Sequence, residues 1–301
     1  MKLVISASPH IDSGATTRKI MGDVLIALCP ALIAAIVIFG WRALLVTAVC
    51  AAACVFFEWG FEKLCHKPST IDDLSAVVTG VILAYNLPVS IPLWQAVFGC
   101  LVAIVAVKQL FGGIGKNFAN PALVGRIVLF LSFSKTMTAW VFPDAVSSAT
   151  PLAQLAAGQK PELWTLLLGN HGGCIGETCA LALLLGGAYL LLRGVITWQT
   201  PVCFVGTVFV LSLILGQDAV RQILSGGLLL GAFFMATDYV TAPQTCWGRA
   251  LFGIGAGLLT CLIRFYGSYA EGVSFAILFM NILTPYLSKW TRSKPLGGVP
   301  A

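Results

Sequence analysis

The sequence predicts an all-α polytopic membrane protein, with about ten transmembrane helices in two inverted five-helix repeats. Of its 301 residues, 58% are hydrophobic and only 10% are charged, whereas a soluble domain carries about 25% charged residues. The apolar residues form runs close to the roughly 20 residues that a spanning helix needs. The two halves also resemble each other after a shift of 151 positions. The composition excludes a soluble globule, a disordered chain and a coiled coil.

Apolar runs bounded by Gly, Pro and charged residues define the predicted elements, which follow here in chain order. Residues 1–22 form a polar segment without an apolar core before Met21, so we expect a retained cytoplasmic segment and no cleavable signal. A first repeat over 23–134 and a second over 163–288 flank a loop at 135–162, and residues 289–301 form a tail. The predicted spans lie near 24–40, 43–60, 74–90, 93–111 and 119–134, and near 175–192, 199–215, 222–237, 249–263 and 272–288.

The distribution of basic residues predicts the orientation. With an even number of spans both termini share one side, and twelve of the 18 Lys and Arg fall on that side against five on the other, while Arg126 lies within a span. The positive-inside rule therefore predicts cytoplasmic termini in the cell (inner) membrane and an extracytoplasmic loop at 135–162. Because topology accounts for the formal charge of +6, we expect lipid as a partner and no nucleic acid. The ten cysteines include no C-x-x-C pair, and we expect no metal site.

The shift of 151 positions aligns the helix-breaking segments of the two halves. It places Pro88–Pro92 on Tyr239–Pro243 and Gly80 on Gly231. An odd number of spans in each copy makes the second copy inverted, an architecture that transporters use to build a central site. Asn86-Leu87-Pro88 and Thr237-Asp238-Tyr239 are predicted to interrupt their spans, and the freed backbone groups must be satisfied inside the protein or in a wet cavity.

The extracytoplasmic loop contains the hydroxyl-rich segment Asp144-Ala-Val-Ser-Ser-Ala-Thr-Pro-Leu152. Pro151 favours an extended backbone at Thr150, which would present the hydroxyl of this residue. Small neighbours would let the active site of another protein close around that hydroxyl. The residues alone indicate either an ordinary loop or a modification site.

The spacing D-x-x-S-x-A-T, formed by Asp144, Ser147, Ala149 and Thr150, resembles the motif at which a dedicated transferase joins FMN to threonine through a phosphoester. Ser148 stands where that motif usually has Gly. The chain as a whole resembles the membrane D subunits of Rnf electron-transport complexes and, more distantly, the B subunits of sodium-translocating NADH:quinone reductases. The resemblance rests on the segments Ser8–His10 with Thr16–Met21, Phe118–Arg126, Gly173–Thr178 and Met235–Asp238.

This resemblance implies a flavin-carrying membrane subunit of an ion-translocating (Na⁺ or H⁺) ferredoxin:NAD oxidoreductase complex, not catalytic alone, that relays electrons through FMN covalently attached to Thr150. It implies the flavin transferase and the A, B, C, E and G subunits of the Rnf complex as partners. It also leaves room for a noncovalent riboflavin between helices near the cytoplasmic side, with no residue assigned. The cofactor would supply the electron chemistry and the protein its position and potential.

A second short match, Ser13-Gly14-Ala15-Thr16, lacks the context of the first. His10 takes the place of the acid, Thr17 takes the place of Pro151, and the charge distribution puts the segment in the cytoplasm. We therefore predict modification of Thr150 and not of Thr16.

Ionisable groups within apolar runs need a partner or a cavity, because each costs at least roughly 2.5–3.5 kcal/mol on insertion scales. Glu177 is a candidate for an ion pathway or else an N-terminal helix carboxylate. Asp238, at a helix break, is a candidate of the same kind or a structural cap. Glu271 is expected at the outer surface, and Arg126 and Asn120 either contact a flavin or pin helices. His171 is expected at the membrane–water interface.

The sequence is also compatible with two other classes of function. An inverted repeat with broken helices also suits a channel or facilitative transporter without a redox cofactor, and fold alone does not decide between them. A membrane anchor with a purely structural role is the third possibility. The loop around Thr150 discriminates among them, because a channel has no reason to carry a flavinylation motif.

Overall fold

The computed structural model describes residues 15–140, 150–267 and 272–292, and this part of the chain consists of helices joined by turns and irregular segments, with one isolated bridge between Pro88 and Cys174. The first half holds α1 (Thr17–Phe39), α2 (Trp41–Leu64), a 3-10 turn η1 (Ile71–Asp73), α3 (Ser75–Tyr85), α4 (Leu93–Leu101), a π-helix η2 (Val102–Gln109) and α5 (Pro121–Ser132). An all-α membrane fold is thereby confirmed.

Three short helices follow, α6 (Ser134–Met137), α7 (Pro151–Ala156) and α8 (Leu163–Leu168). The second half holds α9 (Ala180–Leu192), α10 (Gln199–Ile214), α11 (Ala219–Leu224), α12 (Leu228–Leu230), a second π-helix η3 (Gly231–Met235), α13 (Cys246–Tyr266) and α14 (Val273–Trp290). The segment predicted as one long loop at 135–162 therefore contains α6 and α7.

A helix lies in each of the ten predicted spans, but the lengths differ. Within the described residues, α1, α2 and α13 are long and apolar enough to cross a membrane, and several other apolar helices are shorter. The span predicted at 74–90 ends at Tyr85, and the one at 222–237 is divided between α11 and the short α12–η3 unit. Prolines 88 and 92 and the glycines at 226 and 227 account for these early ends.

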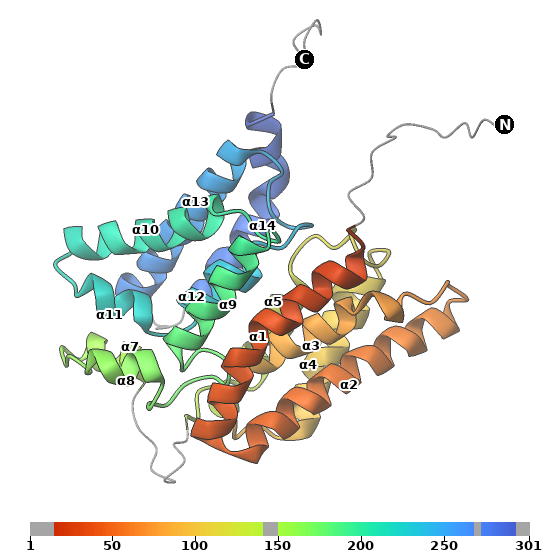
Figure 1. The fold of residues 1–301 in the computed structure, drawn as a ribbon, viewed down its shortest axis with the longest axis horizontal. Helices are drawn as coiled ribbons and strands as arrows, with labels where there is room; N and C mark the ends of the chain where they lie inside the picture. The colour runs from red at the N-terminus through yellow and green to blue at the C-terminus, as the bar shows by residue number, and fades with distance from the viewer. Residues whose placement is uncertain (1–14, 141–149, 268–271, 293–301) are drawn as a thin grey trace, which may run out of the picture.

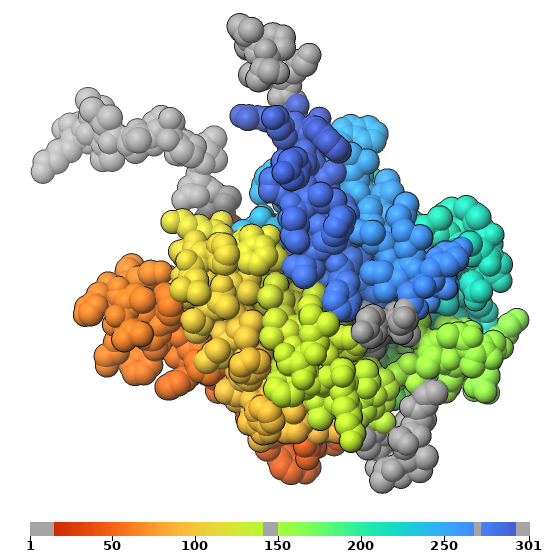
Figure 2. All heavy atoms as spheres, turned by 180° about the vertical axis from the view of Figure 1, so that it is seen from behind, coloured from red at the N-terminus to blue at the C-terminus, as the bar shows by residue number. Residues whose placement is uncertain are grey.

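Figure 1 shows the two halves side by side, with α1–α5 in red to yellow and α9–α14 in green to blue. The start of α1 and the end of α14 lie at the top of this view, and α7 and α8 lie at the lower left. Helix α1 packs along α9, and α14 packs on α5, as the blue and yellow surfaces in Figure 2 show. These two helix pairs join the halves.

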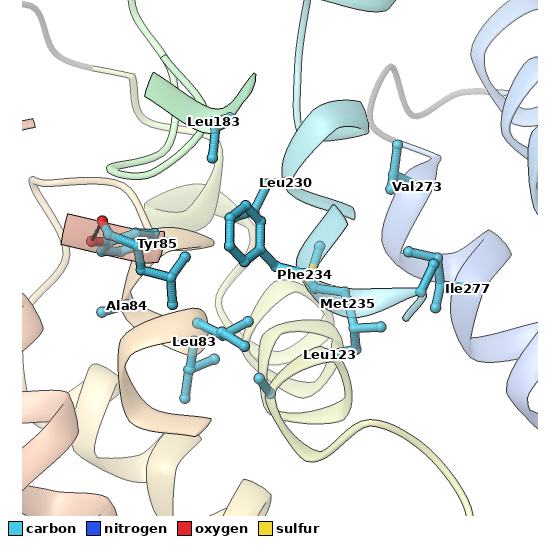
Figure 3. Packing of buried hydrophobic residues seen from close by; sticks show 14 of the residues in the cluster. Leu83, Ala84, Tyr85, Leu123, Leu183, Leu230, Phe234, Met235, Val273 and Ile277 are labelled. Atoms are coloured by element: carbon cyan, nitrogen blue, oxygen red, sulfur yellow. Dashed lines mark hydrogen bonds between the residues drawn. The ribbon is translucent and has the colours of Figure 1, made fainter. Parts of the chain in front are cut away.

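The hydrophobic core extends through both halves and continues across the contact between them. In Figure 3, Leu83 of α3 and Leu123 of α5 meet Phe234 and Met235 of η3, with Ile277 of α14 beside them. The helices approach closely at small residues, as membrane helices do. A Cβ on Gly186 of α9 would lie 2.1 Å from the Ala27 oxygen of α1, so a side chain there requires the helices to separate.

Both predicted helix breaks are present, and their backbone groups are satisfied within the protein. Helix α3 ends at Tyr85, and the extended segment before α9 covers this end: Ile175 N donates to Leu87 O at 3.0 Å and Gly176 N to Tyr85 O at 2.9 Å. The second break follows Met235, whose carbonyl accepts from Asn120 Nδ2 at 3.4 Å. Each broken end is thus held by a segment that is distant in the sequence.

Candidate functional site

A buried arginine stands where the two broken helices meet. Nη1 of Arg126 donates to Asn86 Oδ1 at 2.9 Å and to Ser274 Oγ at 2.6 Å, and Nη2 lies 3.8 Å from Cys174 Sγ. Asn86 in turn donates to Ile82 O at 2.7 Å and to Met235 Sδ at 3.4 Å. Arg126 was expected either to contact a flavin or to connect helices, and these contacts support the second role. Its guanidinium connects α5 to the end of α3 and to α14.

Glu177 lies beside this centre and does not cap α9, which begins three residues later. The residue is 3% exposed, and Oε1 accepts from the backbone N of Cys174 at 3.0 Å. Oε2 has no hydrogen-bond partner within the described part of the chain. A Cβ on Gly227 would lie 3.1 Å from this oxygen, so a glycine provides the space that Oε2 faces. A buried carboxylate oxygen without a partner is costly unless a proton or cation satisfies it.

A cavity of about 290 Å³ opens between the halves at the end of the bundle where α1 begins. Its walls come from the starts of α1, α3 and α5, the end of α9, the two π-helices and the segment at 237–240. Most of the lining is apolar, including Ile82, Phe233 and Phe234. The polar and charged lining residues are Thr17, Ser75, Thr79, Lys108, Asn117, Asn120, Thr237 and Asp238.

The structure places Asp238 on the wall of this cavity, at the second helix break. The Thr241 hydroxyl donates to its carboxylate at 3.0 Å, and Ala242 N donates to its carbonyl at 3.0 Å. Asn120 lines the same cavity, but it also caps α5, because Oδ1 accepts from Ala122 N at 3.1 Å. The cavity thus brings together Asp238 and Asn120, while Glu177 and Arg126 lie outside its lining.

A second group of charged residues borders this cavity and escapes the sequence interpretation. Glu58 of α2, which is fully buried, forms an ion pair of 2.7 Å with Lys108 of η2, and Gln109 donates to the same carboxylate at 2.9 Å. Glu62, one helical turn further along α2, is 3% exposed and bonds to Thr70. Two glutamates four residues apart inside an apolar run were the signal available in the sequence.

Thr150 lies at the start of α7. Its backbone is extended (φ −60°, ψ 155°), as Pro151 predicts, and its Oγ1 accepts from Ala153 N at 3.3 Å as the helix N-cap. Two residues on, Leu152 is buried against the turn at Gly226, where a Cβ would lie 2.5 Å from Leu152 Cδ1. Asp144, Ser147 and Ala149 lie outside the described residues.

Thr16 caps a helix in the same manner, since its Oγ1 accepts from Lys19 N at 3.3 Å. Local geometry therefore does not distinguish the two threonines. Their positions do, because Thr16 precedes α1 at the cavity end of the bundle and Thr150 precedes α7 at the opposite end (Figure 1).

His171, expected at the membrane–water interface, is buried inside the chain, with 6% exposure. Its Nδ1 lies 3.2 Å from the Gly172 carbonyl. Burial lowers the pKa of this imidazole, and backbone hydrogen bonds at Gly172 and Thr178 oppose the shift only in part. Glu271 lies outside the described residues.

A family model and three relatives of known name all place this chain in the same family. The model of the NQR2, RnfD, RnfE family matches residues 4–297. The D subunit of the Na⁺-translocating ferredoxin:NAD⁺ oxidoreductase complex of Acetobacterium woodii is 46% identical, over 99% of this chain and 96% of the relative. The D subunit of the proton-translocating ferredoxin:NAD⁺ oxidoreductase complex of Clostridium ljungdahlii is 41% identical, over 97% and 96%. The D subunit of the ion-translocating oxidoreductase complex of Actinobacillus succinogenes is 34% identical, over 97% of both.

Proposed function

Because the chain belongs to the NQR2, RnfD, RnfE family, we propose that it relays electrons through an FMN joined covalently to Thr150. It is the D subunit of an ion-translocating (Na⁺ or H⁺) ferredoxin:NAD⁺ oxidoreductase complex. Its partners are the other subunits of that complex, which we take to be A, B, C, E and G, together with a flavin transferase and membrane lipid. The cofactor supplies the electron chemistry, and this chain sets where the cofactor lies.

The loop motif carries the proposal. In the modification, Thr150 Oγ1 forms a bond to the phosphorus of the FMN phosphate as the bond from that phosphorus to the rest of the flavin-nucleotide donor breaks, and the hydroxyl proton leaves with the departing group. An extended backbone and half-buried side chain at Thr150 leave its oxygen accessible, and the N-cap bond uses only one of its lone pairs. Leu152, buried two residues later, holds the acceptor near the bundle. Asp144, Ser147 and Ala149 supply the motif on the other side.

The cavity of about 290 Å³ is suited to a noncovalent flavin such as riboflavin. Its size is at the lower end of ligand pockets, which span roughly 300–1,000 Å³. Aromatic Phe233 and Phe234 and several aliphatic side chains would lie along the flat faces of such a ring. Lys108, Asn117 and Asn120 would meet its polar edge. These residues bind and orient the ring, and the apolar lining keeps water away from it.

We further propose an inverted five-plus-five repeat with both termini in the cytoplasm and the Thr150 loop outside. In its support, the two interrupted spans end at Tyr85 and Met235, near positions related by the shift of 151. Glu177 and Asp238 are the candidates for an ion pathway. The buried Oε2 of Glu177, without a partner among the described residues, and the position of Asp238 on the cavity wall support this assignment.

The direct test is peptide mass spectrometry on the complex isolated from a host that has the transferase. The peptide containing Thr150 should carry one FMN, with loss of water, and the chain should fluoresce on a denaturing gel. Thr150→Ala should abolish the fluorescent band, and Thr16→Ala, the matched control at another helix N-cap, should leave it intact. An unmodified Thr150 peptide in the assembled complex would instead favour a channel or facilitative transporter without a redox cofactor.

A further inference from the structure

A chain of hydrogen-bonded polar groups runs from the surface at η1 to the wall of the cavity. Two of its members, Thr70 and Asp73, are half-buried, and the charged members Glu58, Glu62 and Lys108 have exposures of 3% or less. Lys108 lines the cavity, and so does Ser75, whose Oγ accepts from Lys108 Nζ at 2.6 Å. Two of these residues belong to α2, and Lys108 belongs to the π-helix η2.

Every link in this chain is within hydrogen-bonding distance. Lys108 Nζ lies 2.7 Å and 2.9 Å from the two oxygens of Glu58. The Thr70 hydroxyl lies 3.2 Å from Glu58 Oε1 and 2.5 Å from Glu62 Oε1. Thr70 N also donates to both oxygens of Glu62 at 3.2 Å. At the other end, Ser75 bonds to Asp73 through its backbone N at 2.7 Å and through its hydroxyl.

The hydroxyl of Thr70 is the informative link. A hydroxyl carries one proton and two acceptor lone pairs, so it can donate to only one of the two carboxylates that it bridges. A proton on the other carboxylate would be donated to the hydroxyl oxygen and would complete both bonds. The bridge between Glu58 and Glu62 is therefore fully satisfied when the pair holds one proton, which is the arrangement that lets a proton shift along a chain.

The charges lead to the same conclusion. Glu58, Glu62 and Asp73 provide three carboxylates against one ammonium on Lys108, and burial penalises uncompensated charge. A further cation, Lys67, donates from its Nζ to Gln109 O at 3.3 Å. Asp238 lines the same cavity, and the exposed Asp72 lies on η1. A buried ion pair is in general no more stabilising than a well-packed apolar pair, so packing alone does not account for this group.

We propose that Glu62, Thr70, Glu58 and Lys108 form a proton-transfer path from the surface to the cavity. When an acceptor in the cavity takes a proton from Lys108 Nζ, an N–H bond breaks and a neutral amine remains. Protonated Glu58 returns a proton to that amine, Glu62 takes up a proton from water, and the Thr70 hydroxyl then passes its own proton to Glu58 as it takes the new one from Glu62, which restores the pair with one proton. One proton moves inward in each cycle, and no electron passes along the chain.

This inference rests on the proposed function for its acceptor, which is a reduced flavin ring in the cavity. The experiment uses the intact purified complex, reduced rapidly by an excess of a low-potential electron donor. A pH-indicator dye reports proton uptake and absorbance reports flavin reduction. Glu62→Gln keeps the shape of the side chain and hydrogen bonding but cannot carry a proton. It should slow proton uptake on the order of 100-fold, the typical contribution of a positioned proton-transfer group.

Two comparisons separate this role from a structural one. Asp72→Asn removes an equal charge from the same surface outside the path and should match the unaltered complex. A small weak acid such as hydrazoic acid should restore the rate of Glu62→Gln, which it would not do for a misfolded variant. If Glu62→Gln does not assemble, Thr70→Val, nearly identical in shape, should produce the same slowing.

Proton uptake in Glu62→Gln or Thr70→Val as fast as in Asp72→Asn would overturn the path. The noncovalent flavin in each preparation is extracted and quantified separately. Absence of that flavin from the unaltered complex would refute the proposed occupant of the cavity, whereas slowed and rescuable proton uptake would still support the path with another acceptor.

Discussion

Arg126 of α5 donates a hydrogen bond of 2.9 Å to the Oδ1 of Asn86, the C-cap residue that follows α3. The same nitrogen reaches Ser274 at the start of α14. One guanidinium thereby holds a helix break in the first half against a helix of the second. A hydrogen bond to a charged group contributes about 1.5–3 kcal/mol, so this side chain is a major stabilising contact between the halves.

Arg126→Lys should destabilise the chain by about 2–3 kcal/mol, because one ammonium cannot replace both Nη1, which donates to Asn86 and Ser274, and Nη2, which lies beside Cys174. Thermal unfolding of the complex, followed by size-exclusion chromatography, would show the lower midpoint. Arg193→Lys is the matched control, since its ion pair of 3.3 Å with Asp23 is half exposed on the arginine side. Its cost should stay below about 1 kcal/mol. Equal shifts in the two variants would contradict the role assigned to Arg126.

Gly186→Ala should weaken the packing of α9 on α1. The added Cβ would lie 2.1 Å from the Ala27 oxygen, which is backbone and cannot move aside without moving α1. Overpacking of this kind costs about 1–3 kcal/mol. Gly206→Ala in α10 is the control, because nothing lies within 4 Å of the added atom, and alanine favours a helix by up to about 1 kcal/mol over glycine. The thermal midpoints should move in opposite directions.

Asp238→Asn should alter the cation dependence of turnover more than it alters assembly. The amide keeps the size of the side chain and can still accept from the Thr241 hydroxyl, but it removes the charge from the cavity wall. The rate of electron transfer would be measured against Na⁺ concentration and against pH. Asp218→Asn, at the start of α11 and outside the cavity lining, should leave both dependences as they are. Unchanged dependence in Asp238→Asn would make this residue a structural cap.

An impermeant thiol reagent can test the proposed orientation. Cysteine introduced at the exposed Ala157, just after α7, should be labelled in intact cells, and cysteine at the exposed Ser69, before η1, should not. Both variants are compared with the parent chain, whose own exposed cysteines set the background. Labelling of position 69 alone would reverse the orientation and place Thr16 on the side assigned to Thr150.

The buried imidazole of His171 should make the stability of the chain dependent on pH. Burial lowers its pKa in the folded state below the usual value near 6.5. Below that pH the unfolded chain therefore binds a proton that the folded chain does not, and stability is lost as the pH falls through about 6.5. His171→Gln, which cannot titrate, should flatten the fall in thermal midpoint between about pH 7 and about pH 5.5. An identical slope in both proteins would place the titrating group elsewhere.

The sequence predicted the helix breaks because their cause is local: proline removes a backbone donor and restricts the preceding residue, so α3 ends close to where Pro88 requires. It also predicted the extended backbone of Thr150 for the same reason. The partners of Arg126 could not be predicted, since Asn86 and Ser274 lie 40 and 148 positions away. Sequence patterns left its role open between a cofactor contact and a helix pin.

The sequence did not predict the proposed path from Glu62 to Lys108, because its residues come together only through the packing of α2 on η2. Glu58 and Glu62 lie inside an apolar run near its end, and Lys108, near the end of another run, is one of the twelve basic residues on the predicted cytoplasmic side. Only the pairing of α2 with η2 shows that these charges are buried against each other. Because a π-helix wraps more residues into each turn than an α-helix, the α-helical spacing does not predict which face of the helix carries Lys108.

The burial of Leu152 two residues from Thr150 has a consequence for electron transfer over distance. Two residues span at most about 7 Å, so a group carried on Thr150 pivots close to the Gly226 turn against which Leu152 packs. The distance over which such a group can move is then set mainly by the length of the group itself, because the backbone at Thr150 is held in place. A donor and an acceptor that exchange electrons with it must both lie within that short radius, or the neighbouring subunits must bring them there.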